Sequence, residues 1–288
     1  LEAYYTDIRR GRPPAPGQLA DLRRRYDAIG GLSPLAAVTR AQARGLQDEL
    51  DRRAAAGGRR AWQVALGLKH AAPRIADGVD TLVAAGVTRA AALVLAPHHS
   101  ALSVGEYLAA AEAAAADRLE LVPVPPWGTH PALVGLLAER VRQAAARFPL
   151  TARVELLVTA HSLPRRALAL DDPTYPSQLE ATGAAVAAVA GVDRWRIAWQ
   201  SAGRTPEPWI GPDVLDVIRR LPAEGVEGVV VCPAGFTADH LEVLYDLDIE
   251  AREVAAGVGL RLERTASLDD DPRFVALLAD LAEAALGP

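Results

Sequence analysis

Two groups of side chains in this sequence have the composition of a metal-handling site. His161 directly follows the apolar run at residues 154–160, and the junction of a strand with its following loop is where α/β proteins place reactive side chains. Further along the chain, Glu242, Asp246 and Glu250 are spaced four residues apart, which would place them on one face of a helix. Imidazole and carboxylate together suit a divalent first-row metal, and an open site with few ligands could pass that metal on.

Each of these groups also has an ordinary structural interpretation. A histidine after a strand is often a loop residue that hydrogen-bonds to a neighbour. Carboxylates four residues apart cost a helix roughly 0.2–0.5 kcal/mol per pair unless a cation offsets the repulsion. However, Leu241, Leu244 and Leu247 also fit an amphipathic helix with a solvated acidic face. The residue types alone leave both interpretations open.

A basic and aromatic cluster lies near the start of the chain. Arginine can fork to carboxylates and tyrosine offers a flat, amphipathic face, so this cluster could hold a planar polyanion. The same composition is equally typical of a basic, solvated helix. The members of the cluster are Tyr4, Tyr5, Arg9, Arg10, Arg12, Arg23, Arg24, Arg25 and Tyr26.

The composition narrows the class of protein. Half of the 288 residues are hydrophobic, enough for one large domain or two ordinary ones with a buried core. The net charge of −5 argues against a nucleic-acid partner. The single cysteine, Cys232, cannot alone form a disulfide or hold an iron–sulfur cluster, which fits a reducing cytoplasm.

Targeting segments and common catalytic motifs add further limits. No apolar run approaches the roughly 20 residues of a membrane span, and the first residues have no signal-peptide core. We therefore expect no transmembrane segment. P-loop, G-x-G-x-x-G, G-x-S-x-G, H-E-x-x-H and C-x-x-C patterns are all missing from the sequence. Because the chain contains no methionine, we expect that some N-terminal sequence precedes Leu1.

Short apolar runs alternate with stretches of helical period, which predicts an α/β fold of parallel strands joined by crossover helices. Two strand–helix series predict two similar halves with a cleft between them. The first half would comprise residues 1–97, joined by a C-terminal helix at 272–288, and the second residues 98–271. The expected strands are residues 63–68, 91–96, 120–124, 153–160, 195–199 and 228–232. The expected helices are residues 34–56, 74–85, 104–116, 131–147, 175–190 and 214–221.

Eight short motifs lie along the whole length of the sequence. They are YYTDIRRGR at 4–12, RYDAIGGLSPL at 25–35, GLKH at 67–70, APHHS at 96–100, TAHSLP at 159–164, WQSAG at 199–203, TPEPW at 205–209 and GFTADHLEVLY at 235–245. In their order and spacing these motifs resemble the ferrochelatase family, and the similarity is greatest to its soluble Gram-positive branch, which acts on coproporphyrin. The resemblance implies two Rossmann-like halves, each a doubly wound parallel sheet, with a porphyrin cleft between them.

The resemblance also implies roles for individual residues. His161 and Glu242 would be the catalytic pair, contributed by separate halves and facing each other across the macrocycle. Both would be iron ligands, and which of them takes the pyrrole protons stays open. Asp246 and Glu250 would continue the metal-binding line outward. The implied porphyrin-binding residues are Arg9, Arg10, Arg25, Tyr26, Ser33, Lys69, His70, Tyr107 and Trp209.

The function implied by the resemblance is insertion of Fe²⁺ into a porphyrin during haem biosynthesis, with coproporphyrin III giving coproheme. Fe²⁺ is then a substrate, and the enzyme would need no other cofactor and no iron–sulfur cluster. We expect a cytoplasmic monomer. The chain starts after the strand and tyrosine-containing loop with which the family begins, so that contact cannot be assigned. The alternatives are a protoporphyrin IX or sirohydrochlorin chelatase and a non-catalytic carrier of porphyrin or haem.

Overall fold

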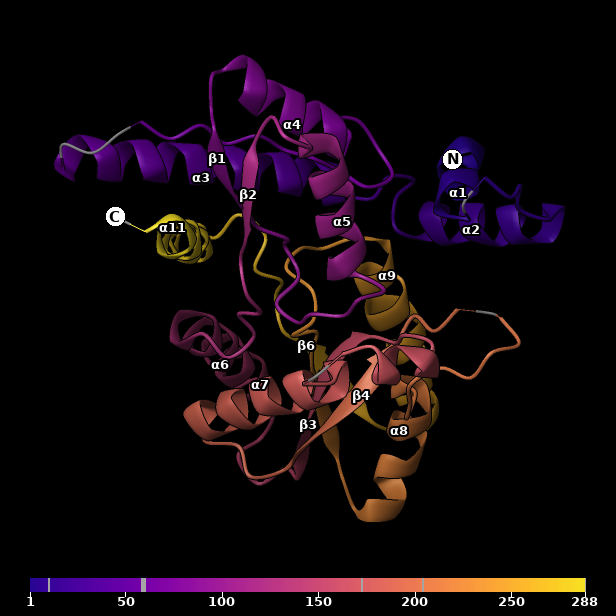
Figure 1. Cartoon of the computed structure of the whole chain (residues 1–288). Helices are drawn as coiled ribbons and strands as arrows, with labels where there is room; N and C mark the ends of the chain where they lie inside the picture. The colour runs from indigo at the N-terminus through magenta and orange to yellow at the C-terminus, as the bar shows by residue number, and fades with distance from the viewer. Residues whose placement is uncertain (10, 58–60, 172, 204, 288) are drawn as a thin grey trace. The chain divides into compact units, whose positions relative to one another are not determined.

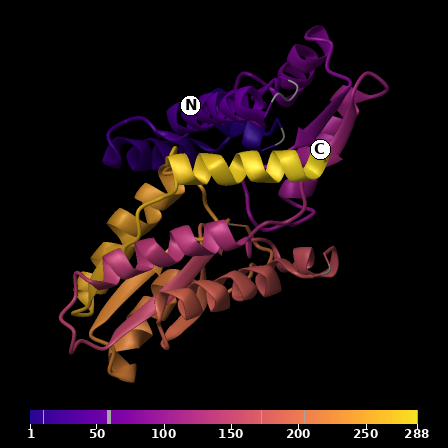
Figure 2. The same cartoon turned by 90° about the vertical axis from the view of Figure 1, so that its left-hand side faces the viewer.

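The computed structural model describes residues 1–9, 11–57, 61–171, 173–203 and 205–287 (Figures 1 and 2). The chain folds into two compact units. Unit 1 comprises Leu1–Val94, Glu106–Val124 and Asp270–Pro288, and unit 2 comprises Leu95–Gly105 and Pro125–Asp269. Each unit combines helices with an all-parallel sheet, and the predicted α/β fold class is therefore confirmed.

Unit 1 is built on a two-stranded parallel sheet, in which β1 (Arg89–Ala92) pairs with β2 (Glu120–Pro123). α4 and α5 share a small apolar core with these strands. α3 packs against α11, which also contacts both strands (Figure 2). Because β1 pairs with β2, residues 106–124 belong to unit 1, whereas the sequence-based division places them in the second half. The helices are α1 (Glu2–Ile8), α2 (Pro16–Ala28), α3 (Leu35–Gly57), α4 (Ile75–Ala84), α5 (Val104–Ala115) and α11 (Pro272–Leu286).

Unit 2 is built on a four-stranded parallel sheet with the order β4-β3-β5-β6. The two central strands, β3 and β5, are buried almost throughout, which explains their mainly apolar sequences. α8 and α10 share one apolar core with this sheet, while α6 and α7 pack on each other and on the strands. The elements are β3 (Val154–His161), β4 (Trp195–Gln200), β5 (Gly228–Cys232), β6 (Arg261–Arg264), α6 (Pro131–Ala145), α7 (Tyr175–Ala190), α8 (Val214–Arg220) and α10 (Arg252–Gly257), with short 3₁₀ turns η1 (Arg165–Ala169) and η2 (Leu221–Glu224).

The acidic segment of unit 2 is not a uniform α-helix. A single turn, α9 (Leu241–Leu244), runs into a π-helical turn, η3 (Asp246–Ala251), before α10 begins. The backbone N–H of Glu250 donates to the carbonyl of Tyr245 at 3.0 Å, which is the i to i+5 pattern of a π-helix. The regular four-residue periodicity predicted for this segment is therefore wrong beyond α9.

The predicted strands differ from the observed ones at three places. The strand predicted at residues 91–96 is β1 at Arg89–Ala92 and ends four residues earlier. Residues 63–68 do not form a strand: the side chain of Gln47, on α3, accepts from the N–H of Val64 at 2.7 Å and donates to the carbonyl of Trp62 at 2.9 Å. These bonds satisfy backbone groups that a ladder would otherwise use. The structure also contains β6, which the sequence did not predict because its residues, Arg-Leu-Glu-Arg, lack an apolar run. In the part of the chain that the structure describes, no helix is long and apolar enough to cross a membrane.

Candidate active site

His161 is the last residue of β3, where the buried strand meets its loop. Its register partner on β4 is Gln200. The Nδ1 atom of His161 lies within hydrogen-bond reach of the carbonyl of Ser162, and a carbonyl can only accept. This bond places the proton on Nδ1 in the neutral imidazole and leaves Nε2 as the atom that can take up a proton or bind a metal.

Glu242 lies beside His161 in the first turn of α9. The distance from His161 Nε2 to Glu242 Oε1 is 3.6 Å, and the side chains are 33% and 40% exposed. His161 ends β3 and Glu242 lies beyond the end of β5, and these strands are neighbours in one parallel sheet. The structure therefore brings the predicted pair together, but the expectation that separate halves contribute the two residues is wrong, because both belong to unit 2.

The pair is strongly coupled electrostatically. Burial disfavours the imidazolium, but the negative charge of Glu242 outweighs burial and raises the pKa of His161 to about 9. Burial likewise disfavours the carboxylate of Glu242, yet the attraction of His161 holds the pKa of that carboxyl well below its usual range. At neutral pH the metal-free pair is therefore an imidazolium and a carboxylate, and a metal that binds Nε2 must displace a proton.

A second imidazole flanks Glu242 on its other oxygen. His240 Nε2 lies 3.5 Å from Glu242 Oε2, and Nδ1 of His240 is 3.1 Å from the carbonyl of Ala238. His240 lies within the motif at 235–245, but no role was predicted for it from the sequence. The feature that could have indicated a role is its position two residues before Glu242, at the extended N-cap of α9.

Buried polar contacts fix the backbone around the pair. Thr159 Oγ1 donates to Gln200 Oε1 at 2.9 Å, and Gln200 Nε2 donates to the backbone carbonyl of Glu242 at 3.1 Å. Both side chains are fully enclosed. Ser201, the next residue on the chain, has a φ of 59°, which is uncommon for a residue other than glycine, and its hydroxyl donates to Asp246. These bonds join β3 and β4 to the acidic segment.

Asp246 and Glu250 lie on the π-helical turn that follows. Asp246 is buried and hydrogen-bonded to Ser201, while Glu250 is half-buried. Among the described residues, no group of three or more His, Cys, Asp or Glu side chains is arranged to hold a metal ion. The role of Asp246 and Glu250 in metal binding stays a prediction.

Seven of the predicted porphyrin-binding residues belong to unit 1. They are Arg9, Arg25, Tyr26, Ser33, Lys69, His70 and Tyr107. Lys69 pairs with Glu106, and its Nζ lies 5.2 Å from the ring centroid of Tyr107. Nδ1 of His70 lies 2.8 Å from Oδ2 of Asp7. The hydrogen bonds of Arg74 and His70 hold the pKa of Asp7 below its usual value. Lys69 and His70 are therefore already matched by carboxylates.

The remaining unit 1 residues lie on or beside α1 and α2. The guanidinium of Arg9 is 5.8 Å from the ring centroid of Tyr5, and its Nε is buried with no hydrogen-bond partner among the described residues. Arg25 Nε is 3.2 Å from Asp21 Oδ2. Ser33 Oγ accepts from the N–H of Leu35 at 3.4 Å. Arg10, also predicted to bind porphyrin, lies outside the described residues.

The comparisons with known proteins identify the family. The ferrochelatase family model matches residues 12–286. The coproporphyrin III ferrochelatase of Anoxybacillus flavithermus is 45% identical, with 97% of this chain and 89% of that protein covered. The coproporphyrin III ferrochelatase of Bacillus subtilis is 41% identical, with coverage of 100% and 93%. This chain belongs to the ferrochelatase family. The resemblance noted in the sequence is therefore confirmed.

Solved structures agree with this family at the level of the fold. SirB from Bacillus subtilis, solved with Fe³⁺, has a TM-score of 0.58 at 14% identity, covering 84% of this chain and 89% of its own. CbiX, the terminal enzyme for biosynthesis of sirohaem in denitrifying bacteria, has a TM-score of 0.56 at 19% identity, covering 96% of each chain. The chelatase-like fold expected for a ferrochelatase is therefore confirmed.

Trp209 is the predicted porphyrin-binding residue that belongs to unit 2 with the His161–Glu242 pair. Its indole Nε1 donates to Thr205 Oγ1 at 2.8 Å. Its ring packs so closely on Gly203 that an added β-carbon there would come within 2.3 Å. In this ferrochelatase the tryptophan is thus held by its own loop, and its contact with porphyrin stays a prediction.

Proposed function

We propose that this ferrochelatase inserts Fe²⁺ into coproporphyrin III to give coproheme. The observation that carries the proposal is the half-buried His161–Glu242 pair at one edge of the unit 2 sheet, in a chain of this family. The choice of coproporphyrin is supported by the relatives named above, which are called coproporphyrin III ferrochelatases. Coproporphyrin would also pair with more of the arginines near the N-terminus, because it carries four propionates where protoporphyrin IX carries two.

The reaction exchanges one Fe²⁺ for the two protons of the porphyrin core, so the site must accept both protons. In our proposal, Nε2 of His161 takes a pyrrole proton, because Nδ1 is engaged with the carbonyl of Ser162. Because the pKa of His161 is raised to about 9, its imidazolium must first lose the proton on Nε2. The carboxylate of Glu242, with one oxygen near His161 and the other near His240, offers the path by which protons leave.

Iron reaches the ring nitrogens only when their lone pairs point out of the porphyrin plane. A site that favours a bent macrocycle exposes those lone pairs, and binding energy from the periphery can stabilise the bent form. Arg9 and Arg25 would supply part of this energy through the propionates, since guanidinium–carboxylate bonds are directional and strong. In this proposal, residues of unit 1 bind the porphyrin, and residues of unit 2 bind the metal and transfer the protons.

The substrates of the proposed reaction are the porphyrin and ferrous iron. We further propose, from the family resemblance, that the enzyme acts as a monomer in the cytoplasm and needs no cofactor besides its substrate iron. Light scattering during size-exclusion chromatography tests the first point: a mass near 30.4 kDa per particle is expected for this chain, and twice that mass would contradict the monomer.

Turnover under anaerobic conditions tests the proposed function. With excess coproporphyrin III and Fe²⁺, an enzyme converts many equivalents of porphyrin to coproheme, as followed by absorbance, whereas a carrier stops at one equivalent. We expect multiple turnovers and a higher kcat/KM for coproporphyrin III than for protoporphyrin IX. Turnover only with sirohydrochlorin, or a plateau at one equivalent, would contradict the proposal.

A further inference from the structure

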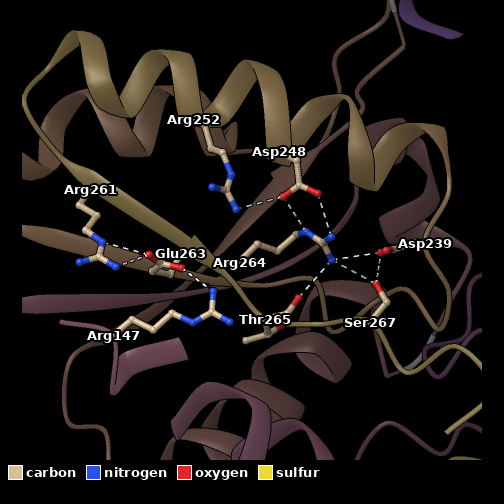
Figure 3. Close-up of polar contacts among 9 residues, drawn as sticks. All are labelled: Arg147, Asp239, Asp248, Arg252, Arg261, Glu263, Arg264, Thr265 and Ser267. Atoms are coloured by element: carbon tan, nitrogen blue, oxygen red, sulfur yellow. Dashed lines mark hydrogen bonds and ion pairs between the residues drawn. The ribbon is translucent and has the colours of Figure 1, made fainter. Parts of the chain in front are cut away.

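Arg264, the last residue of β6, holds the π-helical turn through a two-pronged ion pair. Its Nε and Nη2 donate to the two carboxylate oxygens of Asp248 at 2.9 and 2.8 Å (Figure 3). The side chain of Arg264 is only 10% exposed. A forked guanidinium–carboxylate pair fixes direction as well as distance, so it constrains η3 more tightly than a single hydrogen bond would.

The same guanidinium also reaches the loop before α9. Arg264 Nη1 lies 3.1 Å from Asp239 Oδ1, 3.1 Å from the carbonyl of Thr265 and 3.3 Å from Ser267 Oγ (Figure 3). Ser267 in turn donates to Asp239. The backbone N–H of Asp239 donates to Asp269 Oδ1 at 2.8 Å. Asp239 is therefore held by side chains of the segment that follows β6.

These two carboxylates bracket Glu242 in the sequence. Asp239 precedes α9 and Asp248 follows it, so one buried cation spans the turn on which Glu242 lies. α9 has only four residues and no side-chain cap, and so short a helix has no stability of its own in water. The π-helical turn beyond it is also uncommon. The geometry of this segment must therefore come from tertiary contacts.

We propose that Arg264 is a positioning residue, which clamps both ends of the segment carrying Glu242 and thereby keeps its carboxylate opposite Nε2 of His161. This inference rests on the proposed function for its catalytic consequence. Arg264 acts on the carboxylate side of the pair, because its contacts are with the acidic segment and the loop after β6. It complements Gln200, which holds the backbone of Glu242 from the sheet.

The same strand supplies a matched control. Arg261, at the start of β6, donates to Glu263 from Nε and Nη2 at 2.9 and 2.7 Å, and Arg147 donates to the other oxygen of Glu263 at 2.9 Å (Figure 3). This network resembles that of Arg264 in its arginine–carboxylate chemistry, but it joins β6 to the loop after α6 and not to the segment carrying Glu242. Loss of this ion pair at Arg261 should leave Glu242 in place.

The kinetic test compares Arg264→Lys, Arg264→Gln and Arg261→Lys in the full chain. Lysine keeps the charge of Arg264 but cannot fork. We expect Arg264→Lys to lower kcat about 10- to 100-fold, because a misplacement of about 1 Å can cost about 100-fold. Its affinity for coproporphyrin III and its melting temperature should stay close to those of the unsubstituted chain. Arg264→Gln should lower both kcat and melting temperature, and Arg261→Lys should change neither kcat nor porphyrin affinity.

A readout without turnover separates this inference from the proposed function. In the metal-free protein at fixed pH, the ¹⁵Nε2 resonance of His161 reports the contact with Glu242. We expect Arg264→Lys to move this resonance in the direction in which Glu242→Gln moves it, and Arg261→Lys to leave it unchanged. An unmoved resonance, or an unchanged kcat, in Arg264→Lys would overturn the positioning role. Absence of turnover in the unsubstituted chain would instead overturn the proposed function, while the resonance still decides the role of Arg264.

Discussion

The two units neutralise their candidate residues in opposite ways. In unit 1 basic side chains already have acidic partners: Lys69 pairs with Glu106, and His70 with Asp7. In unit 2 the acidic side chain, Glu242, lies between two imidazoles. On the proposed function, a propionate that binds unit 1 would displace a carboxylate, whereas a metal that binds Nε2 of His161 would displace a proton.

The largest effect should follow from removing the imidazole of unit 2. We expect His161→Ala to lower kcat about 10³-fold, in the range for loss of a general base, while coproporphyrin affinity stays nearly unchanged because the predicted propionate contacts lie in unit 1. Anaerobic initial rates give kcat, and quenching of fluorescence gives the affinity for coproporphyrin. His130→Ala, at the N-cap of α6, is the control and should keep its kcat. A His161→Ala variant that turns over at a near-normal rate would remove this residue from the mechanism.

The second effect is the pH dependence of metal binding. The pKa of His161 is raised to about 9, so the imidazole is protonated below this pH and metal must expel its proton. The affinity for Zn²⁺, used as a redox-stable probe, should rise about tenfold per pH unit up to about pH 9 and level off above it. Isothermal titration in several buffers also counts the released proton. Binding that is independent of pH between about 6 and 8 would contradict a proton exchange at His161.

A smaller effect is expected in unit 1. Arg24 and Arg25 both pair with Asp21, but only Arg25 is a predicted porphyrin contact. Arg25→Ala should raise KM for coproporphyrin about tenfold, the loss of one charge-assisted hydrogen bond of about 1.5 kcal/mol, with kcat unchanged. Arg24→Ala should leave both constants unchanged. Equal effects of the two substitutions would mean that net charge, and not a specific contact, governs binding.

The smallest effect tests the competition within unit 1. Glu106→Gln removes the carboxylate that pairs with Lys69 and frees the ammonium for a propionate. Because exposed ion pairs are worth about 0.2–1 kcal/mol, we expect coproporphyrin to bind up to about fivefold more tightly. Glu112→Gln, further along α5 and exposed, is the control. Weaker binding by Glu106→Gln than by Glu112→Gln would show that Glu106 supports the site and does not compete for Lys69.

The sequence predicted the parts of the fold that local pattern determines. Apolar runs located β3, β4 and β5, and the motifs brought His161 and Glu242 forward as a pair, which the structure places 3.6 Å apart. Residues 63–68 form no strand, and the N–H of Val64 bonds instead to the side chain of Gln47, a distant partner that periodicity cannot reveal. The contacts of Arg264 with the π-helical turn join residues that are far apart in sequence, so only the three-dimensional structure reveals them.

The pKa of His161 in the metal-free protein tests the central claim most directly, because the account requires His161 and Glu242 to act as one coupled pair. Titration of the His161 resonances by NMR should give a pKa of about 9 in the unsubstituted chain. In Glu242→Gln the pKa should fall, because the substitution removes the charge that contributes most to raising it. A pKa near the ordinary value in the unsubstituted chain that Glu242→Gln leaves unchanged would contradict the coupling and the mechanism that follows from it.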